Sequence, residues 1–258
     1  MKIAHMRGET LTLATTVGYS QVLGAPPGAN MLEVEVPSAT KENISLLLTP
    51  KLRHIWYYDD SATDKYTNFT KEFSDRNTST GSGTSLNTFA TADFIYFGGY
   101  RRFRGLAVNV ANTNGTGSVA TVKYWDGTAW TDITATDGTI SGAQTLGQDG
   151  LITWTVPTDW TTTTVNGVAD LYWVRYSVGT ALDATVSIIE VYSLANLTLN
   201  STNTDAEGQD YVLLQSNAQS LPPYRYYFDS ERYGGVEMKS ASITSAANLN
   251  WYTCVGGY

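Results

Sequence analysis

Short runs of alternating hydrophobic and polar residues fill the middle of the chain, between Phe94 and Val191. In residues 106–110 the large apolar side chains stand at every second position, and residues 150–156 repeat the pattern. Successive side chains leave opposite faces of a β-strand, so this period of two predicts strands with one buried face. The runs recur roughly every 8–12 residues, a spacing typical of a β-sandwich or a β-barrel.

Similar runs lie on both sides of this central block. They cover residues 11–15, 31–36 and 44–48 before it, and 211–215, 224–228, 235–239 and 249–255 after it. No segment carries a helical apolar stripe longer than two turns; residues 51–58 fit a helix or a strand, and Pro50 and the aromatic residues favour the strand at least equally. The chain is therefore predicted to be all-β.

Turn signals separate the predicted strands. In the sequence WDGTAW, Asp126-Gly127 stands between two strand-like runs and predicts a β-hairpin. Residues 74–92 are polar and without periodicity, which predicts a long mobile loop.

Composition narrows the classes of function. Charged residues make up only 16% of the chain and the net charge is −8, so the basic stripe that a nucleic-acid binder needs is missing. Arg101, Arg102 and Arg104 form the single arginine cluster, which is more typical of a local salt-bridged patch. Neither an apolar signal-peptide core nor a membrane-spanning run occurs, which indicates a protein made in the cytoplasm and no membrane partner.

Residues suited to catalysis are few. One cysteine (Cys254) and two histidines (His5 and His54) match no metal-ligand spacing, and no phosphate loop or nucleophile motif occurs. The aspartates fall mostly in turns, where their side chains cap the backbone; a pair serving glycoside hydrolysis is the weaker alternative. Asp205, Glu207 and Asp210 form a weak calcium signal. We therefore expect no catalytic residue, cofactor or metal site.

Aromatic residues make up 12% of the chain, and two interpretations of their location are open. Most tryptophans in strands are expected to be core, and Arg175 shares a strand face with Trp173, so that its guanidinium is expected to lie on the indole. The alternative is an exposed platform that stacks on sugar rings or on a protein partner. Its candidate residues are Trp160, Tyr224, Tyr226 and Tyr227.

The order of motifs in residues 93–191 resembles a known β-sandwich domain. A strand ADFIYFG is followed by Phe-X-Gly-Leu, a hairpin Tyr-Trp-Asp-Gly-X-X-Trp, a strand ending in Pro-X-X-Trp, and Tyr-Trp-Val-Arg. This pattern is similar to domains of virion structural proteins of tailed bacteriophages, in capsid-decorating, neck or baseplate-associated components. The resemblance implies a non-enzymatic, multi-copy particle protein that is made in the bacterial host cytoplasm and located in the virion.

Together these observations predict a jelly-roll-like antiparallel β-sandwich with additional N- and C-terminal strands that form a second β region. The expected parts are an N-terminal β region (1–55), a β-sandwich domain (56–193) and a C-terminal β region (194–258) that packs with 1–55 or stands apart. The expected function is a capsid decoration or auxiliary protein, or a neck or tail accessory. Its expected partners are copies of itself and other virion proteins, such as the major capsid or tail proteins. The alternative is a carbohydrate-binding module for host-surface glycans.

Overall fold

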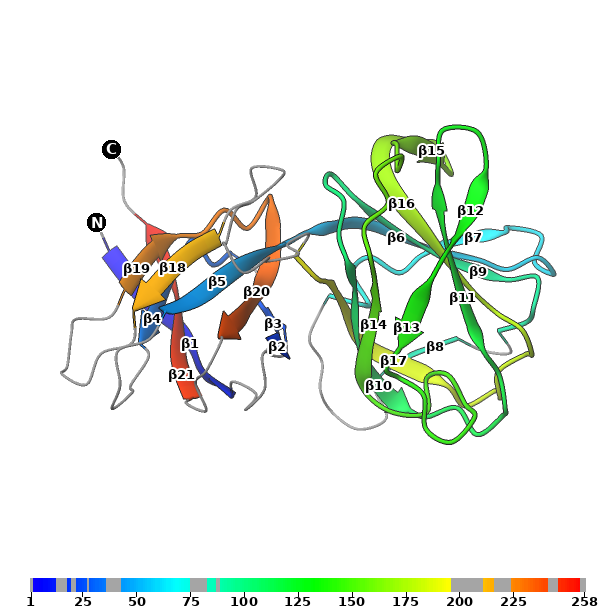
Figure 1. The fold of residues 1–258 in the computed structure, drawn as a ribbon, viewed down its shortest axis with the longest axis horizontal. Coiled ribbons are helices and arrows are strands. Elements are labelled where there is room, and N and C mark those ends of the chain that lie inside the picture. The colour runs from blue at the N-terminus through cyan, green and yellow to red at the C-terminus, as the bar shows by residue number, and fades with distance from the viewer. Residues whose placement is uncertain are drawn as a thin grey trace. The chain divides into compact units, whose positions relative to one another are not determined.

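The chain is an all-β protein built of antiparallel strand pairs (Figure 1). The computed structural model describes residues 2–12, 18–19, 22–26, 28–35, 43–74, 83–86, 89–195, 211–215, 224–240 and 246–255, and this part of the chain contains no helix. Two compact units are present: residues 1–51 together with 195–258 form unit 1, and residues 52–194 form unit 2.

Unit 2 is a β-sandwich of two sheets. The first sheet, called the seven-stranded sheet, has the order β12 (Trp130–Ile133), β11 (Ala120–Trp125), β16 (Val168–Val178), β9 (Phe94–Gly99), β6 (Leu52–Tyr58), β7 (Tyr66–Asn68), and β15 (Thr163–Val165) adds to β16. The second, called the five-stranded sheet, has the order β13 (Ala135–Asp137), β14 (Gly150–Trp154), β10 (Gly105–Asn112), β17 (Ser187–Ser193), β8 (Thr84–Ser85).

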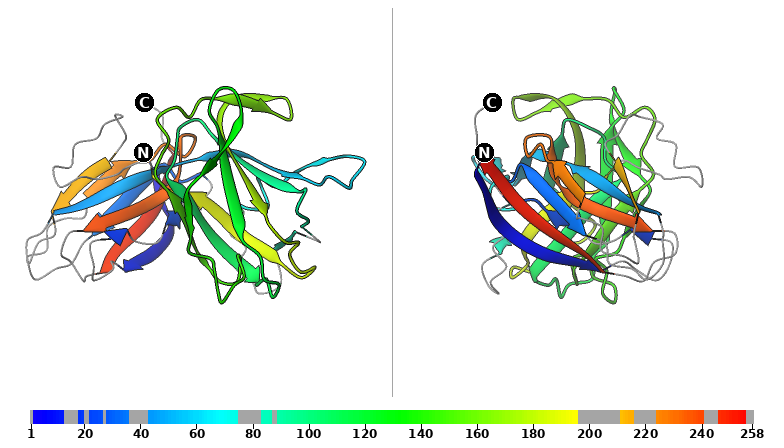
Figure 2. Two further views of the ribbon diagram at one scale, coloured as in Figure 1. Left: turned by 45° about the vertical axis from the view of Figure 1, so that its right-hand side comes forward. Right: turned by 90° about the vertical axis from the view of Figure 1, so that its left-hand side faces the viewer.

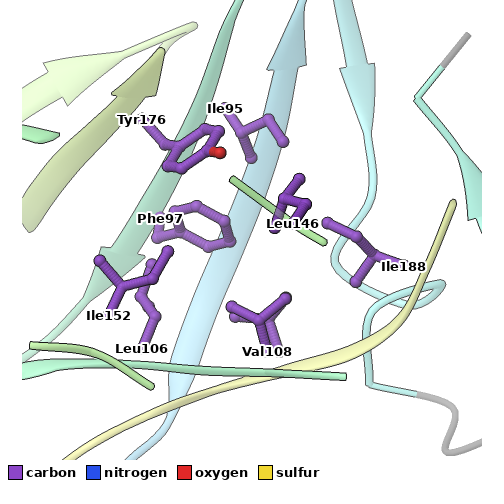
Figure 3. A pocket seen from close by; sticks show the side chains of 9 residues that line it. Ile95, Phe97, Leu106, Val108, Leu146, Ile152, Tyr176 and Ile188 are labelled. Carbon is purple, nitrogen blue, oxygen red and sulfur yellow. The ribbon is translucent and has the colours of Figure 1, made fainter. Parts of the chain in front are cut away.

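The core of unit 2 lies between these sheets. Leu106 and Val108 on β10 are buried, as the alternation predicts, and they face Phe97 and Tyr176 from the other sheet around a small apolar cavity (Figure 3). The cavity measures about 10 Å³, which is no more than the room that one water molecule needs. The interior is therefore a packed core and offers no ligand pocket at this point.

Two turn predictions can be compared with the structure. The hairpin at WDGTAW is confirmed, because Trp125 of β11 pairs directly with Trp130 of β12. The predicted polar loop, residues 74–92, is described at residues 74, 83–86 and 89–92. Here β8 pairs with β17, and Leu86 and Phe89 are fully buried in the core. The rest of that loop lies outside the described residues.

Unit 1 is a second pair of sheets, and both sheets combine strands from the two ends of the sequence. One sheet has the order β1 (Lys2–Thr12), β21 (Ala246–Val255), β4 (Met31–Glu35), β19 (Tyr224–Tyr227). The other has the order β18 (Tyr211–Gln215), β5 (Asn43–Pro50), β20 (Tyr233–Ser240), β2 (Gly18–Tyr19), with β3 (Leu23–Gly24) also paired to β20. Figure 2 shows β1 in dark blue running beside β21 in red.

Buried side chains from both ends of the sequence form the core of unit 1: Leu32, Val34, Leu46, Phe228, Val236, Met238 and Leu249. The expected N- and C-terminal β regions thus share one unit. Its boundaries fall after Lys51 and after Leu194. The first boundary precedes the expected one because β6 pairs with β9 and so belongs to unit 2.

Candidate binding surface on the seven-stranded sheet

Carboxylates of unit 2 serve mainly to shape turns. The Asp126 side chain accepts hydrogen bonds from the hydroxyl of Thr131 (2.7 Å) and from the backbone N–H groups of Thr128 (2.7 Å) and Ala129 (2.8 Å). These donors, with the Thr131 hydroxyl foremost, hold the pKa of Asp126 well below its usual range. Asp59 and Asp183 accept backbone N–H groups in the same way and also have lowered pKa values. The turn-capping interpretation is confirmed at Asp59 and Asp126, and Asp183 shows the same kind of cap.

Neither a metal-binding cluster nor a membrane-spanning helix occurs in the described residues. Within the described ranges, no three or more His, Cys, Asp or Glu side chains gather where a metal ion would be held. The weak calcium signal at Asp205, Glu207 and Asp210 lies outside these ranges. No helix in the described part of the chain is long and apolar enough to cross a membrane.

Trp160 is not part of an exposed platform. Its side chain is 2% exposed, and its ring packs against Phe103 (5.2 Å between ring centroids) and Tyr172 (6.0 Å). The segment after Pro157 looks like a surface loop in the sequence, but it places the indole in the core of unit 2. This candidate is therefore corrected to a core residue, because a buried indole presents no face for stacking.

The three tyrosines of β19 do not form a common platform either. Tyr224 and Tyr226 are half-buried against the core of unit 1, and burial raises the pKa of Tyr226 to about 12. Tyr227 points the other way and is 81% exposed. On the same side as Tyr227, Arg225 forms a salt bridge with Glu33 (2.8 Å). Strand β19 therefore offers one exposed ring, and it is a terminal strand of its sheet as far as the structure describes the chain.

Aromatic rings do gather on the outer face of the seven-stranded sheet, which is the face turned away from the core of unit 2. The register places Trp56 opposite Tyr96, and Tyr58 opposite both Phe94 and Tyr66. Residues directly opposite each other in neighbouring strands share a face of the sheet. We call the following set the aromatic face: His54, Trp56, Tyr58, Tyr66, Phe94, Tyr96, Trp125, Trp130 and Arg175.

The rings of the aromatic face touch one another in a continuous series across five strands. Centroid separations run from 5.1 Å (Tyr58 to Tyr66) to 6.4 Å (Trp56 to Tyr66), within the range of favourable aromatic pairs. Tyr96 is 7% exposed, and the other members of the set are half-buried. The rings therefore hold one another in place while part of each remains open to solvent.

Arg175 lies among these rings. Its guanidinium carbon is 4.3 Å from the ring centroid of Phe94 and 5.2 Å from that of Trp130, which is cation–π geometry. The sequence predicted the indole of Trp173 as its partner. Trp173 instead lies over Gly98 on β9, where an added Cβ would come within 2.6 Å of the indole ring. The prediction named the right kind of interaction with the wrong rings.

Trp173 closes one end of the aromatic face. Its side chain is fully buried, and its Nε1 donates a hydrogen bond to the carbonyl oxygen of Thr163 (3.1 Å). The two-residue turn between β15 and β16, Asn166 (φ 46°) and Gly167 (φ 78°), brings Val165 and Val168 against this indole. Both residues are left-handed, as expected for an Asn-Gly hairpin turn.

The two lysines beside this face are paired with carboxylates. Lys123 on β11 forms a salt bridge with Asp132 (2.9 Å), and Lys65 forms one with Asp60 (3.1 Å). Three nitrogen atoms of the aromatic face have no hydrogen-bond partner: His54 Nδ1, Trp56 Nε1 and Arg175 Nε. Burial, and then the charge of Arg53, lower the pKa of His54, so its neutral form is favoured near neutral pH.

The sequence carried a signal for this surface. In residues 54–58 and 94–97 the side chains are aromatic or apolar at successive positions, and therefore on both faces of the strand. A strand with one solvated face instead alternates apolar and polar residues. The dipeptide Asn166-Gly167 is likewise a sequence signal for the hairpin turn that brings Val165 and Val168 against Trp173. No protein-family model, curated protein or solved structure matches this chain.

Proposed function

We propose that the chain is a non-enzymatic structural component of a tailed-phage virion, a capsid decoration or auxiliary protein or a neck or tail accessory. It acts through contacts with copies of itself and with other virion proteins, and it is made in the bacterial host cytoplasm. The motif order of residues 93–191 supports the virion assignment by resemblance. The observation that carries the non-enzymatic part is the use of the turn carboxylates: Asp59, Asp126 and Asp183 are held as ionised backbone caps.

Unit 1 supplies the attachment surface in this proposal. In its four-stranded sheet β19 is one of the two terminal strands among the described residues, and it presents Tyr227, 81% exposed, beside Arg225. A terminal strand offers a row of backbone groups to which a strand of another chain adds. Part of the segment that follows β19 is not available to a partner. Phe228, Tyr233 and Val236 are buried in the core of unit 1.

The test measures association with particles and with itself. The mass of the full chain is determined by light scattering after size exclusion, alone and after incubation with phage particles that lack this protein. A defined oligomer or a stable complex with particles is expected. A monomer that ignores particles would contradict the proposal.

A matched pair of variants locates the surface. Tyr227→Lys places a charge on the exposed side of β19 and is expected to weaken association, because charged side chains disfavour strand addition at edges. Val119→Lys changes a residue that is 67% exposed in unit 2 and is expected to leave association unchanged. Equal loss in both variants would remove β19 from the proposal.

A further inference from the structure

The outer face of the seven-stranded sheet is aromatic where an ordinary sandwich has polar residues. We propose that the aromatic face of unit 2 binds a neutral polysaccharide, with pyranose rings stacked on the half-exposed side chains of Trp56, Tyr58, Tyr66, Trp125 and Trp130. This activity goes beyond the structural role proposed for the chain and does not depend on it.

The kind of side chain on this face selects a ring-shaped ligand. On the described part of the aromatic face, aliphatic side chains are found only at the end closed by Trp173, where Val165, Val168 and Leu171 pack around that indole. The remaining surface is built of aromatic rings, whose π-faces carry partial negative charge. A pyranose has a flat face of C–H groups with partial positive charge, which complements such rings. Protein interfaces are also enriched in aromatic residues, so the ligand class is decided by the charge and by the unpartnered hydrogen-bonding atoms of this face.

Charge selects a neutral ligand. Lys123 and Lys65 are neutralised by Asp132 and Asp60, and the guanidinium of Arg175 is held between two rings. The chain as a whole carries a net charge of −8. A polyanion such as a nucleic acid or a uronate polymer would find no unpaired basic row on this face and would be repelled by the rest of the molecule.

The unpartnered nitrogens are consistent with an oxygen-rich ligand. His54 Nδ1, Trp56 Nε1 and Arg175 Nε are buried atoms of this face and have no hydrogen-bond partner. A buried polar group without a partner costs free energy, and a sugar hydroxyl that reached one of these atoms would remove part of that cost. The hydroxyl is suited to all three atoms because it both donates and accepts hydrogen bonds.

The arrangement of the rings favours binding because their side chains are already held in place before a ligand arrives. Trp130 is fixed by edge contacts with Tyr96 (5.5 Å) and Trp125 (5.8 Å), and Arg175 lies against its face. Side chains that are already immobilised lose less conformational entropy when a ligand binds.

The experiment is affinity electrophoresis of the full chain in native gels that contain hydroxyethylcellulose, galactomannan or dextran, with polygalacturonate as the acidic comparison. We expect at least one neutral polymer to retard the protein, and we expect quenching of tryptophan fluorescence on addition of that polymer. Trp130→Ala is expected to raise the dissociation constant about tenfold or more, and Trp130→Phe to raise it less because a ring remains.

Controls separate loss of binding from loss of structure. Tyr192→Ala removes a half-buried ring from the outer side of the five-stranded sheet and is expected to bind as the unchanged protein does. Thermal unfolding of each variant verifies the fold. Trp125→Ala serves as the second binding variant if Trp130→Ala unfolds at lower temperature.

Three results would overturn the inference. One is a failure of all three neutral polymers to retard the folded protein, and another is stronger binding to polygalacturonate than to any of them. The third is loss of association with phage particles in Trp130→Ala without glycan binding by the unchanged protein. That result would make the aromatic face a protein-docking surface and would leave the proposed virion function standing.

Discussion

The two sheets of unit 2 share one core but differ in the side chains they turn away from it. On the five-stranded sheet the outward positions include Ala107, Asn109 and Thr153, and Glu190 accepts hydrogen bonds from Asn109 Nδ2 (2.6 Å) and from the Tyr192 hydroxyl (2.8 Å). On the seven-stranded sheet the equivalent positions carry the aromatic face. Both sheets contribute buried apolar side chains to the core, so the contrast between them lies in their outer faces.

This difference separates what the fold needs from what it does not. A sheet packed on one side is stable with mostly small or polar residues on the other, as the five-stranded sheet illustrates, where Leu151 and Tyr192 are the larger outward side chains opposite Ala107. Half-exposed tryptophan and tyrosine rings leave apolar surface in water, which gives folding less than full burial would. This difference is the reason for proposing that the aromatic face binds a ligand, except at the end where Trp173 is buried.

The largest expected effect is at that buried end. Trp173→Ala removes a fully buried indole and its hydrogen bond to Thr163, and it should lower the free energy of unfolding by about 3–5 kcal/mol. Urea denaturation measures this loss. A cost below about 1 kcal/mol would mean that the whole outer face, Trp173 included, is dispensable for stability.

Gly98→Ala tests the packing of Trp173 from the neighbouring strand, β9. An added Cβ would stand within 2.6 Å of the Trp173 ring, so the indole must shift. We expect a loss of about 1–3 kcal/mol in the free energy of unfolding. In the Trp173→Ala background the same change should cost less than it does alone, and additive losses would argue against the close approach.

How far the sequence predicts this molecule depends on the range of the interactions involved. Local patterns sufficed for the buried row of Leu106 and Val108 and for the hairpin at Asp126-Gly127, because alternation and turn chemistry act between near neighbours. Trp160 was misplaced because the burial of a loop residue is decided by distant rings such as Phe103. The aromatic face was missed because five separate strands must be aligned before its rings meet.

On the polar side of the comparison, Glu190→Gln should have a smaller effect. The glutamine keeps one carbonyl acceptor but turns an amide donor toward either Asn109 or Tyr192, which also donate. The expected loss is about 1 kcal/mol in the free energy of unfolding. Glycan binding should not change, and a change would show that the two outer faces do not act independently.

The smallest expected effect is the pH dependence that His54 adds on the aromatic side. Its folded-state pKa lies below the ordinary value near 6.5, so the unfolded chain binds the proton more readily. The contribution of His54 to stability is therefore complete above that value and declines as the pH falls through it. Denaturation midpoints between pH 7.5 and pH 5.5, compared with those of His54→Gln, isolate this contribution. A midpoint difference that stays constant with pH would contradict it.

The pairing of β1 with β21 also sets an order of events during synthesis. Lys2 lies opposite Val255, and both sheets of unit 1 require strands from beyond residue 210. Residues 52–194 are continuous in the sequence, so unit 2 can form its sandwich during synthesis. At that stage the C-terminal strands that pair with the first strands of unit 1 have not yet been made. A nascent chain would thus have a finished aromatic face before it could form the β19 edge through which we propose that it joins a particle.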